Sequence, residues 1–186
     1  MDQVNIFCRQ VRARSIENRQ AMSLMHRHHL TGQVFSILRQ ELDSIVRAIY
    51  LLSITDQDYR NQLIRQSISG EKWTAKNSRK KITDREMVEL ATTLHGWAER
   101  VYRFGCSFIH LSKFHDYQER DPVQELTDQE KDIIKESFWH YHGRPKEREL
   151  TLIDIDFYLP MVFEKVSDNL ECYLRMLEEG KNLNDN

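Results

Sequence analysis

The segment from Thr83 to Tyr117 places apolar residues at the spacing of an α-helix over most of its length. It opens with Thr83 and Glu86, the spacing of a capping box, which satisfies the first free backbone donors of a helix. The apolar residues fall within an arc of about 140° on a helical wheel. They are Met87, Leu90, Ala91, Leu94, Trp97, Ala98, Val101, Phe108 and Ile109. The pattern predicts one continuous helix over about residues 84–112 with one buried face. Gly105 lies within that face, where a missing side chain lets another group approach closely.

Helical spacing recurs along the rest of the chain, and the six glycines and three prolines leave little room for the turns of an all-β fold. The segments that show it are residues 3–29, 33–54, 58–67, 127–139 and 151–178, and Pro160 should kink or split the last of these. We predict a single all-α domain over residues 1–186, with a frayed tail at 178–186. The expected architecture is an up-and-down helical bundle of four main helices plus short helices. Residues 33–54 and 84–112 should form its central antiparallel pair.

The composition excludes several classes of function. A net charge of −2 gives no electrostatic reason to expect tight binding to duplex nucleic acid. No apolar run reaches the length of a membrane span, and the first residues lack the apolar core of a signal peptide. The cysteines at 8, 106 and 172 are odd in number and far apart, which favours reduced thiols and a cytoplasmic location.

Three polar side chains line one edge of the central helix. Arg103 and His110 are seven residues apart and project within roughly 20° of each other if the helix continues. Ser107 lies between them, so a fixed cation, a hydroxyl and a titratable imidazole share one edge. This is the strongest candidate site in the sequence.

Two charged residues lie on the most apolar predicted helix, residues 33–54. Glu41 falls near the centre of its apolar stripe, and Arg39 lies at the edge of that stripe. An unpartnered buried carboxylate costs several kcal/mol, so Glu41 must be paired, protonated or facing a polar cavity. It is either the structural partner of a buried Arg or His, or part of a functional site.

A polar and basic stretch precedes the central helix. An exposed Trp73 beside Arg79, Lys80 and Lys81 could contact RNA, since an aromatic face stacks on bases while cations follow the phosphates. The alternative is a mobile linker. The arginines of the first helix leave a similar choice between a solvated face and a basic stripe for phosphates. They are Arg9, Arg12, Arg14 and Arg19.

No sequence motif indicates a metal or a cofactor. The histidines cluster at positions 26, 28 and 29 and at 140 and 142, without an HExxH motif, an ExxH pair or the Cys/His spacing of a zinc site. Nucleotide-binding glycine loops and the GxSxG nucleophile motif are also absent from the sequence. We therefore expect neither a metal nor a cofactor.

The run from Arg103 to His110, RFGCSFIH, resembles the motif of the HEPN superfamily, in which a His follows an Arg after four to six residues. The preceding segment ILRQELDSIVRAIYLL is similar to the long apolar helix before that motif. Together the two segments resemble uncharacterised bacterial proteins related to abortive-infection HEPN families. The resemblance covers about twenty residues in motif and residues 1–178 in architecture. In the family the motif tends to straddle a helix start, whereas here the pattern predicts that it lies inside a helix.

The resemblance implies a metal-independent endoribonuclease of a bacterial defence or toxin–antitoxin system. It would work as a homodimer whose two motifs face a shared cleft, and an antitoxin or defence protein could be a further partner. His110 would act as acid or base on the RNA, and Arg103 would stabilise the phosphoryl oxygens. Ser107 could hold the phosphate, while Glu41 could orient His110 or pair with Arg103.

A non-catalytic interaction module is the alternative. In that case Arg103 pairs with Glu41 or Glu99, and His110 is a histidine with its hydrogen bonds satisfied. Phe104 and Phe114, expected on the outward side of the helix, predict a symmetric dimer with its contact near residues 100–117.

Overall fold

The computed structural model describes residues 2–143 and 148–185. Within these two ranges the chain forms seven α-helices and two short 3₁₀ helices, and it has no strand, only one isolated bridge between Thr74 and Lys81. The α-helices are α1 (Gln3–Arg27), α2 (Thr31–Ser53), α3 (Gln57–Ile68), α4 (Asp84–Leu94), α5 (Ala98–Ile109), α6 (Asp128–His142) and α7 (Leu152–Glu178). The 3₁₀ helices are η1 (Lys113–Asp116) and η2 (Pro122–Glu125). The prediction of an all-α bundle is confirmed.

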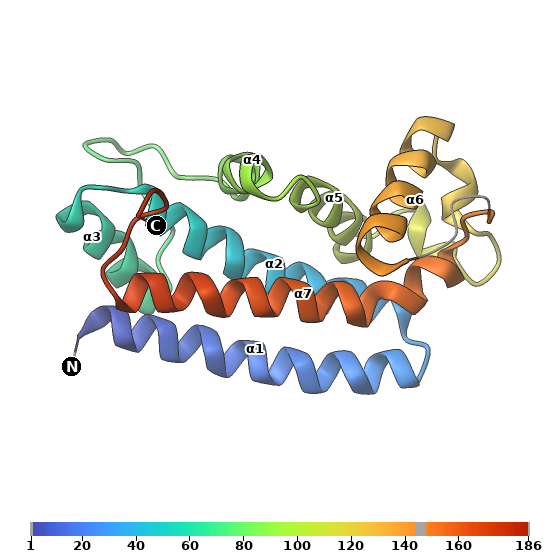
Figure 1. Ribbon diagram of the computed structural model, residues 1–186, viewed down its shortest axis with the longest axis horizontal. Coiled ribbons are helices and arrows are strands. Elements are labelled where there is room, and N and C mark those ends of the chain that lie inside the picture. The colour runs from blue at the N-terminus through green and yellow to red at the C-terminus, as the bar shows by residue number, and fades with distance from the viewer. Residues whose placement is uncertain (1, 144–147, 186) are drawn as a thin grey trace.

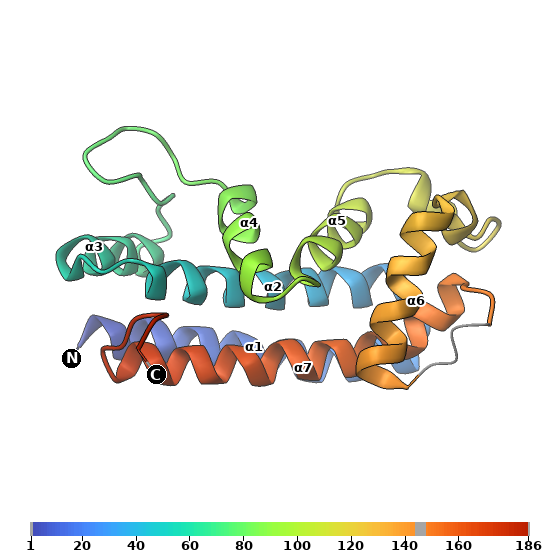
Figure 2. The same cartoon turned by 45° about the horizontal axis from the view of Figure 1, so that its top comes forward.

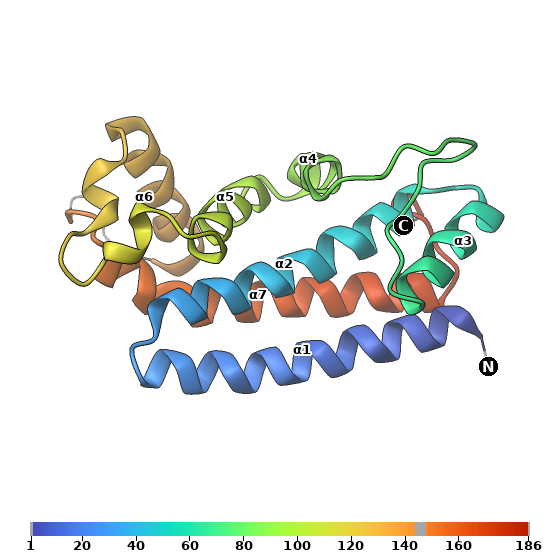
Figure 3. The same cartoon turned by 180° about the vertical axis from the view of Figure 1, so that it is seen from behind.

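Three long helices form the body of the molecule. α1, α2 and α7 lie side by side, with α2 and α7 running in the same direction and α1 antiparallel to both (Figure 1, Figure 3). α4 and α5 lie across α2 on the side away from α1, and α6 packs at the end of the molecule where α7 begins (Figure 2). α2 is therefore enclosed, because α1 and α7 cover one side and α4 and α5 cover the other. None of the described helices is long and apolar enough to cross a membrane.

The sequence pattern explains why α2 takes the central position. Its apolar residues cover most of its circumference, so burial on several sides removes the most apolar surface from water. The apolar residues of α2 with at most 2% of their surface exposed are Val34, Phe35, Leu38, Leu42, Ile45, Val46, Ala48, Ile49, Leu51 and Leu52. Helix starts also follow the sequence, since Thr83 forms the predicted N-cap, and Thr127 and Thr151, where two further helical segments are expected to begin, are N-caps as well.

The prediction of one continuous helix over residues 84–112 is wrong. The chain leaves helical geometry at His95, and α4 and α5 form a V over α2 (Figure 2). His95 Nε2 lies 2.8 Å from the hydroxyl of Tyr173 on α7, and its ring lies 5.2 Å from that of Trp97. Gly96, a weak helix former, follows directly. This contact with α7 outweighs local helical propensity, and only α5 keeps the predicted antiparallel packing along α2.

Pro160 does not split the last helix, and α7 continues through it from Leu152 to Glu178. Proline has no N–H, so the carbonyl of Asp156, four residues earlier, lacks its usual helical donor. His26 of α1 lies beside it, with Nε2 3.1 Å from that carbonyl oxygen. The Nε2–H tautomer can therefore donate the missing hydrogen bond from a neighbouring helix.

Gly105 lets α5 approach α2 closely, as the sequence predicts. A Cβ at this position would lie 2.7 Å from the Cβ of Arg39, closer than real Cβ contacts allow. The Arg39 Cβ is bonded directly to the backbone of α2, so the overlap is relieved only if the two helices move apart.

Gly105→Ala should therefore destabilise the fold, although alanine favours a helix by about 1 kcal/mol over glycine. Overpacking of this kind costs about 1–3 kcal/mol, and we expect the melting temperature to fall by several degrees. Gly96→Ala is the matched control, since nothing lies within 4 Å of its added Cβ. An equal or higher melting temperature for Gly105→Ala in thermal denaturation would contradict this packing.

Candidate functional site

Arg103 points away from the core of the bundle. Its side chain is 67% exposed, and its guanidinium Nη2 lies 3.6 Å from Oε1 of Glu130 on α6. It lines a cavity of about 430 Å³ between α5, η1, η2 and α6, together with Ser107 and Lys113. Lys113 is itself paired with Glu125 across this cavity. The expected structural pairing of Arg103 with Glu41 or Glu99 does not occur in the described contacts.

His110 is the first residue beyond α5 rather than a residue within a helix. Its backbone is extended, with φ −94° and ψ 138°, and its N–H donates to the carbonyl of Cys106 at 3.1 Å. The chain turns here because the Ser112 hydroxyl donates to the carbonyl of Ser107 at 2.7 Å and also caps η1. The projection within 20° of Arg103 assumes a continuing helix, so that prediction is wrong. His110 is exposed, and the side chains that line the Arg103 cavity do not include it.

Ser107 retains part of its hydrogen-bonding capacity. Its hydroxyl donates to the carbonyl of Arg103 at 3.1 Å, within its own helix. The oxygen can still accept a hydrogen bond, but its proton is engaged. Ser107 therefore lies in the same cavity as Arg103, as an acceptor more than as a donor.

Two apolar residues flank His110 and are open to solvent. Ile109 is 48% exposed and Leu111 is 93% exposed. A large aliphatic side chain that stays almost wholly exposed contributes no hydrophobic stabilisation to the fold of a single chain. The end of α5 thus presents an imidazole between two uncovered apolar side chains.

Phe104 and Phe114 do not form the outward aromatic surface that the sequence predicts. Both are half-buried, and their rings pack edge to face with centroids 6.1 Å apart. Phe104 also packs on Phe35 of α2, and Phe114 packs on Phe108. The two aromatics cover the junction of α5 and η1, because the chain turns after Ile109 and folds Phe114 back onto α5.

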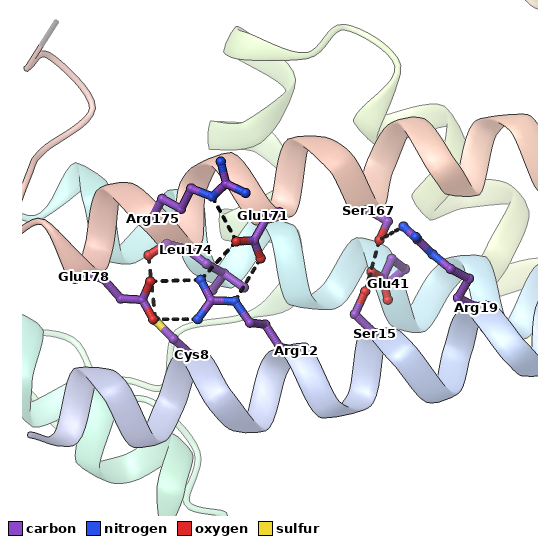
Figure 4. A network of polar contacts seen from close by, with 10 residues as sticks. All are labelled: Cys8, Arg12, Ser15, Arg19, Glu41, Ser167, Glu171, Leu174, Arg175 and Glu178. Carbon is purple, nitrogen blue, oxygen red and sulfur yellow. Dashed lines mark hydrogen bonds and ion pairs between the residues drawn. The ribbon is translucent and has the colours of Figure 1, made fainter. Parts of the chain in front are cut away.

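Glu41 lies far from this end of α5, on the opposite face of α2. It is fully buried, and its partners are the hydroxyl of Ser15 and the amide of Asn18, whose Nδ2 donates at 2.9 Å. Ser15 Oγ is in turn 3.1 Å from the hydroxyl of Ser167 on α7 (Figure 4). Among the described residues, no hydrogen bond or ion pair joins Glu41 to an Arg or a His, so neither predicted charge partner is correct. Glu41 joins α1 to α2 through neutral donors.

Three of the α1 arginines, Arg12, Arg14 and Arg19, bind carboxylates on neighbouring helices instead of forming a solvated face or a phosphate stripe. Arg12 donates to Glu171 at 2.9 Å and to Glu178 at 2.5 Å, both on α7 (Figure 4). Arg14 pairs with Asp43 of α2, and Arg19 pairs with Glu164 of α7. These pairs connect α1 to the rest of the bundle, and the sequence did not reveal them because each partner is distant along the chain.

The two carboxylates that bind Arg12 should make the fold sensitive to acid. Hydrogen bonds from Arg12 lower the pKa of Glu171 and of Glu178 below the ordinary value of 4.5. Because the folded-state pKa is the lower one, the stabilisation is fully present above about pH 4.5 and is lost as the pH falls through the folded pKa. Arg12→Met should lower the melting temperature at pH 7 and flatten its decrease between roughly pH 5 and pH 3. The exposed Arg65→Met serves as control, and identical slopes in all three proteins would rule out this role.

Arg39 is part of the interior rather than of an open site. Only 7% of its surface is exposed, and its Nη2 donates to Asp84 at 3.1 Å. Its guanidinium carbon lies 4.4 Å from the ring centroid of Tyr102, a cation–π contact. Arg39 thus fastens α2 to α4 and α5, and this engagement leaves it poorly placed to contact an RNA phosphate.

The expectation of an exposed Trp73 is wrong. Trp73 is 2% exposed, and its indole N–H donates to the hydroxyl of Ser67 at 2.7 Å. The guanidinium of Arg47 lies over its ring at 5.1 Å. The loop turns back on itself, with a bridge between Thr74 and Lys81. In this conformation Trp73 packs against α2 and α3. Trp73 cannot stack on a base in this conformation.

The basic residues after Trp73 are exposed. Lys80 pairs with Glu86 of α4, and Lys81 donates to the carbonyl of Lys72 at 3.5 Å. Arg79 lies at the exposed end of the loop. These cations remain accessible to phosphates, but without an aromatic platform beside them.

The cysteines and the metal-binding residue types add no further candidate site in the described part of the chain. Burial raises the pKa of the Cys8 thiol to about 12, which makes it unreactive. Cys106 and Cys172 are free as well. Across residues 2–143 and 148–185, no three His, Cys, Asp or Glu side chains are grouped so that they could hold a metal ion.

Comparisons with known proteins do not place the chain in a family. No family model, no curated protein and no solved structure matches it. The resemblance to the HEPN superfamily therefore stays a prediction, based on the motif from Arg103 to His110, the apolar segment that precedes it and the helical layout.

Proposed function

We propose that the chain is a HEPN-like, metal-independent endoribonuclease that acts as a homodimer. The observation that carries the proposal is the setting of His110, which is exposed at the end of α5 between Ile109 and Leu111. A second copy packed on these apolar residues would bring two imidazoles to one interface. Such a contact is isologous, which is the common form of a two-fold dimer.

The chemistry suits the side chains at this end of the molecule. The imidazole of His110 can accept the proton of a ribose 2′-hydroxyl or protonate the leaving 5′-oxygen. Arg103 presents a planar fork of donors to the phosphoryl oxygens as negative charge grows on them. Its contact with Glu130 is solvent-exposed and weak, so a phosphate can displace it. Arg79, Lys80 and Lys81 could bind the RNA backbone farther away.

The experiment is a cleavage assay on a structured RNA with the full-length chain. Cleavage should continue in excess chelator, since the proposed mechanism uses no metal, and the products should carry 2′,3′-cyclic phosphate ends. Loss of all activity in chelator, or 5′-phosphate and 3′-hydroxyl products, would refute the mechanism. The proposed place in a defence or toxin–antitoxin system predicts a partner protein that suppresses this activity.

Leu111→Glu should shift the protein from dimer to monomer. A carboxylate at a position that is 93% exposed costs nothing in the free chain, but it would face its own copy near the two-fold axis. Light scattering at tens of micromolar (about the range in which specific dimers persist) measures the change. Ile153→Glu is the matched control, because Ile153 is 82% exposed but lies on α7. A wild-type monomer under these conditions would exclude the dimer.

A non-catalytic helical interaction module is the second candidate, and the contact between Arg103 and Glu130 favours it. In that case Arg103 holds α6 against α5, and the exposed end of α5 binds a partner without chemistry. Glu130→Gln distinguishes the two functions. It should leave the melting temperature unchanged if Arg103 is free for RNA, and it should loosen α6 if the pair is structural.

A further inference from the structure

A second cavity adjoins the Arg103 cavity. Its volume is about 110 Å³, and side chains of α2, α5, α6 and α7 form its walls together with Trp97 just before α5. Five of the lining side chains are aromatic: Phe35, Trp97, Phe104, Phe138 and Tyr141. Neither Arg103 nor His110 lines it, although Arg100, Phe104 and Ile134 line both this cavity and the Arg103 cavity.

Arg100 provides the charge in this apolar wall. It is half-buried and donates to the hydroxyl of Ser137 at 3.0 Å. Of the ion pairs between residues in the described ranges, none includes Arg100, although most arginines of this chain bind a carboxylate. Burial lowers the pKa of Arg100, but its guanidinium stays charged at any physiological pH. A half-buried cation of this kind normally has an anionic partner.

The mouth of the cavity is also cationic. Lys165 lines it and is exposed on α7, and Tyr141 lines it and is 51% exposed on α6. No ion pair between two described residues includes Lys165. A ligand that enters between Tyr141 and Lys165 therefore passes a positive charge before it reaches the aromatic wall.

We propose that this cavity binds a small aromatic carboxylate, with its ring among the aromatic side chains and its carboxylate on Arg100. The cavity is smaller than the apolar cavity of roughly 150 Å³ that holds benzene, but it is open to solvent, so a single ring can enter while the carboxylate stays at the opening. The charge fits, because a carboxylate satisfies the free donors of a guanidinium fork. A nucleotide is too large for the space, and a neutral aromatic would leave Arg100 without its counter-ion.

Benzoate and phenylacetate are the probes, and benzyl alcohol is the neutral probe of similar shape. Binding to the full-length chain can be followed by calorimetry and by the NMR signal of the Trp97 indole N–H. We expect benzoate or phenylacetate to bind at least tenfold more tightly than benzyl alcohol, and to shift that signal. Cyclohexanecarboxylate, with the same charge and no aromatic ring, should bind more weakly than benzoate.

Two variants locate the ligand. Arg100→Met should weaken carboxylate binding by about tenfold to a hundredfold, the usual value of a charge-assisted hydrogen bond, without weakening benzyl alcohol. Val162→Trp should fill the cavity and abolish binding of both probes, while the exposed Arg65→Met should leave both unchanged. Lys165→Met provides a second test should Arg100→Met fail to fold, since it should also weaken only the carboxylates. Equal binding of carboxylate and alcohol, or carboxylate binding that survives Val162→Trp, would overturn the proposal.

Discussion

His110→Ala is expected to slow RNA cleavage by about a hundredfold to ten-thousandfold while leaving the melting temperature unchanged. This is the usual loss when a positioned acid or base is removed. The stability should not change, because His110 lies beyond the last turn of α5 and its side chain is exposed. Single-turnover cleavage of a labelled RNA measures the first quantity, and thermal denaturation measures the second.

Arg103→Ala should produce a loss of similar size with the same thermal stability. Its one described ion pair is exposed, and such pairs contribute about 0–1 kcal/mol. Arg103→Lys should recover little activity, because an ammonium cannot present two parallel donors to a phosphate. If Arg103→Lys does not restore cleavage, the positive charge at this position is not sufficient and the geometry of the guanidinium is required.

His28→Ala is the control for both variants, since His28 is also exposed but belongs to the C-terminal cap of α1 and does not line the Arg103 cavity. It should cleave RNA at the wild-type rate. A purified wild type that never cuts RNA, together with a His110→Ala variant that melts at lower temperature, would assign this end of α5 a structural role.

The local signals in the sequence predicted most of the helices, but not the break between α4 and α5. Thr83 and Thr127 each precede a glutamate by three residues, and both capping boxes form in the structure. The apolar stripe of α2 predicted its burial in the same way. These features depend on neighbours within a few residues, so they can be read without knowledge of the fold.

Long-range contacts explain where the predictions failed. The helix over residues 84–112 breaks because His95 binds Tyr173, a residue 78 positions later. Trp73 is buried because its loop folds back on α2, although its neighbours in sequence are polar. No local pattern reveals either contact.

Arg60 is a buried residue that the sequence did not single out at all. It is 2% exposed, and its guanidinium donates to the carbonyls of Ile54 and Lys181 at 3.0 Å and 2.9 Å. It thereby joins the end of α2 to the segment that follows α7. Its role depends on carbonyl groups, which every residue carries, so no pattern of side chains could have identified it.

Glu41→Ala should lower the free energy of unfolding by about 2–4 kcal/mol and leave the activity of the folded protein unchanged. The substitution removes packed atoms and leaves Ser15 and Asn18 without their acceptor in a buried setting. Urea denaturation measures the stability, and RNA cleavage at low temperature measures the activity of the folded fraction. Because Glu41 faces α1 and not α5, a role in catalysis would require a change in helix packing.

Two further variants separate hydrogen bonding from charge at this position. Glu41→Gln keeps a carbonyl to accept from Asn18 and gains an amide that can donate to Ser15, so most of the stability should be retained. The triple variant Ser15→Ala, Asn18→Leu, Glu41→Leu removes Glu41 and both of its donors. It should be more stable than Glu41→Ala alone, because the remaining Ser167 still accepts a hydrogen bond from Arg19 at 3.1 Å. If Glu41→Gln is instead as unstable as Glu41→Ala, the carboxylate charge is essential. In that case Ser15 and Asn18 are not the only groups that stabilise it. If Glu41→Gln is as stable as the wild type but cleaves RNA more slowly, Glu41 has a role in catalysis.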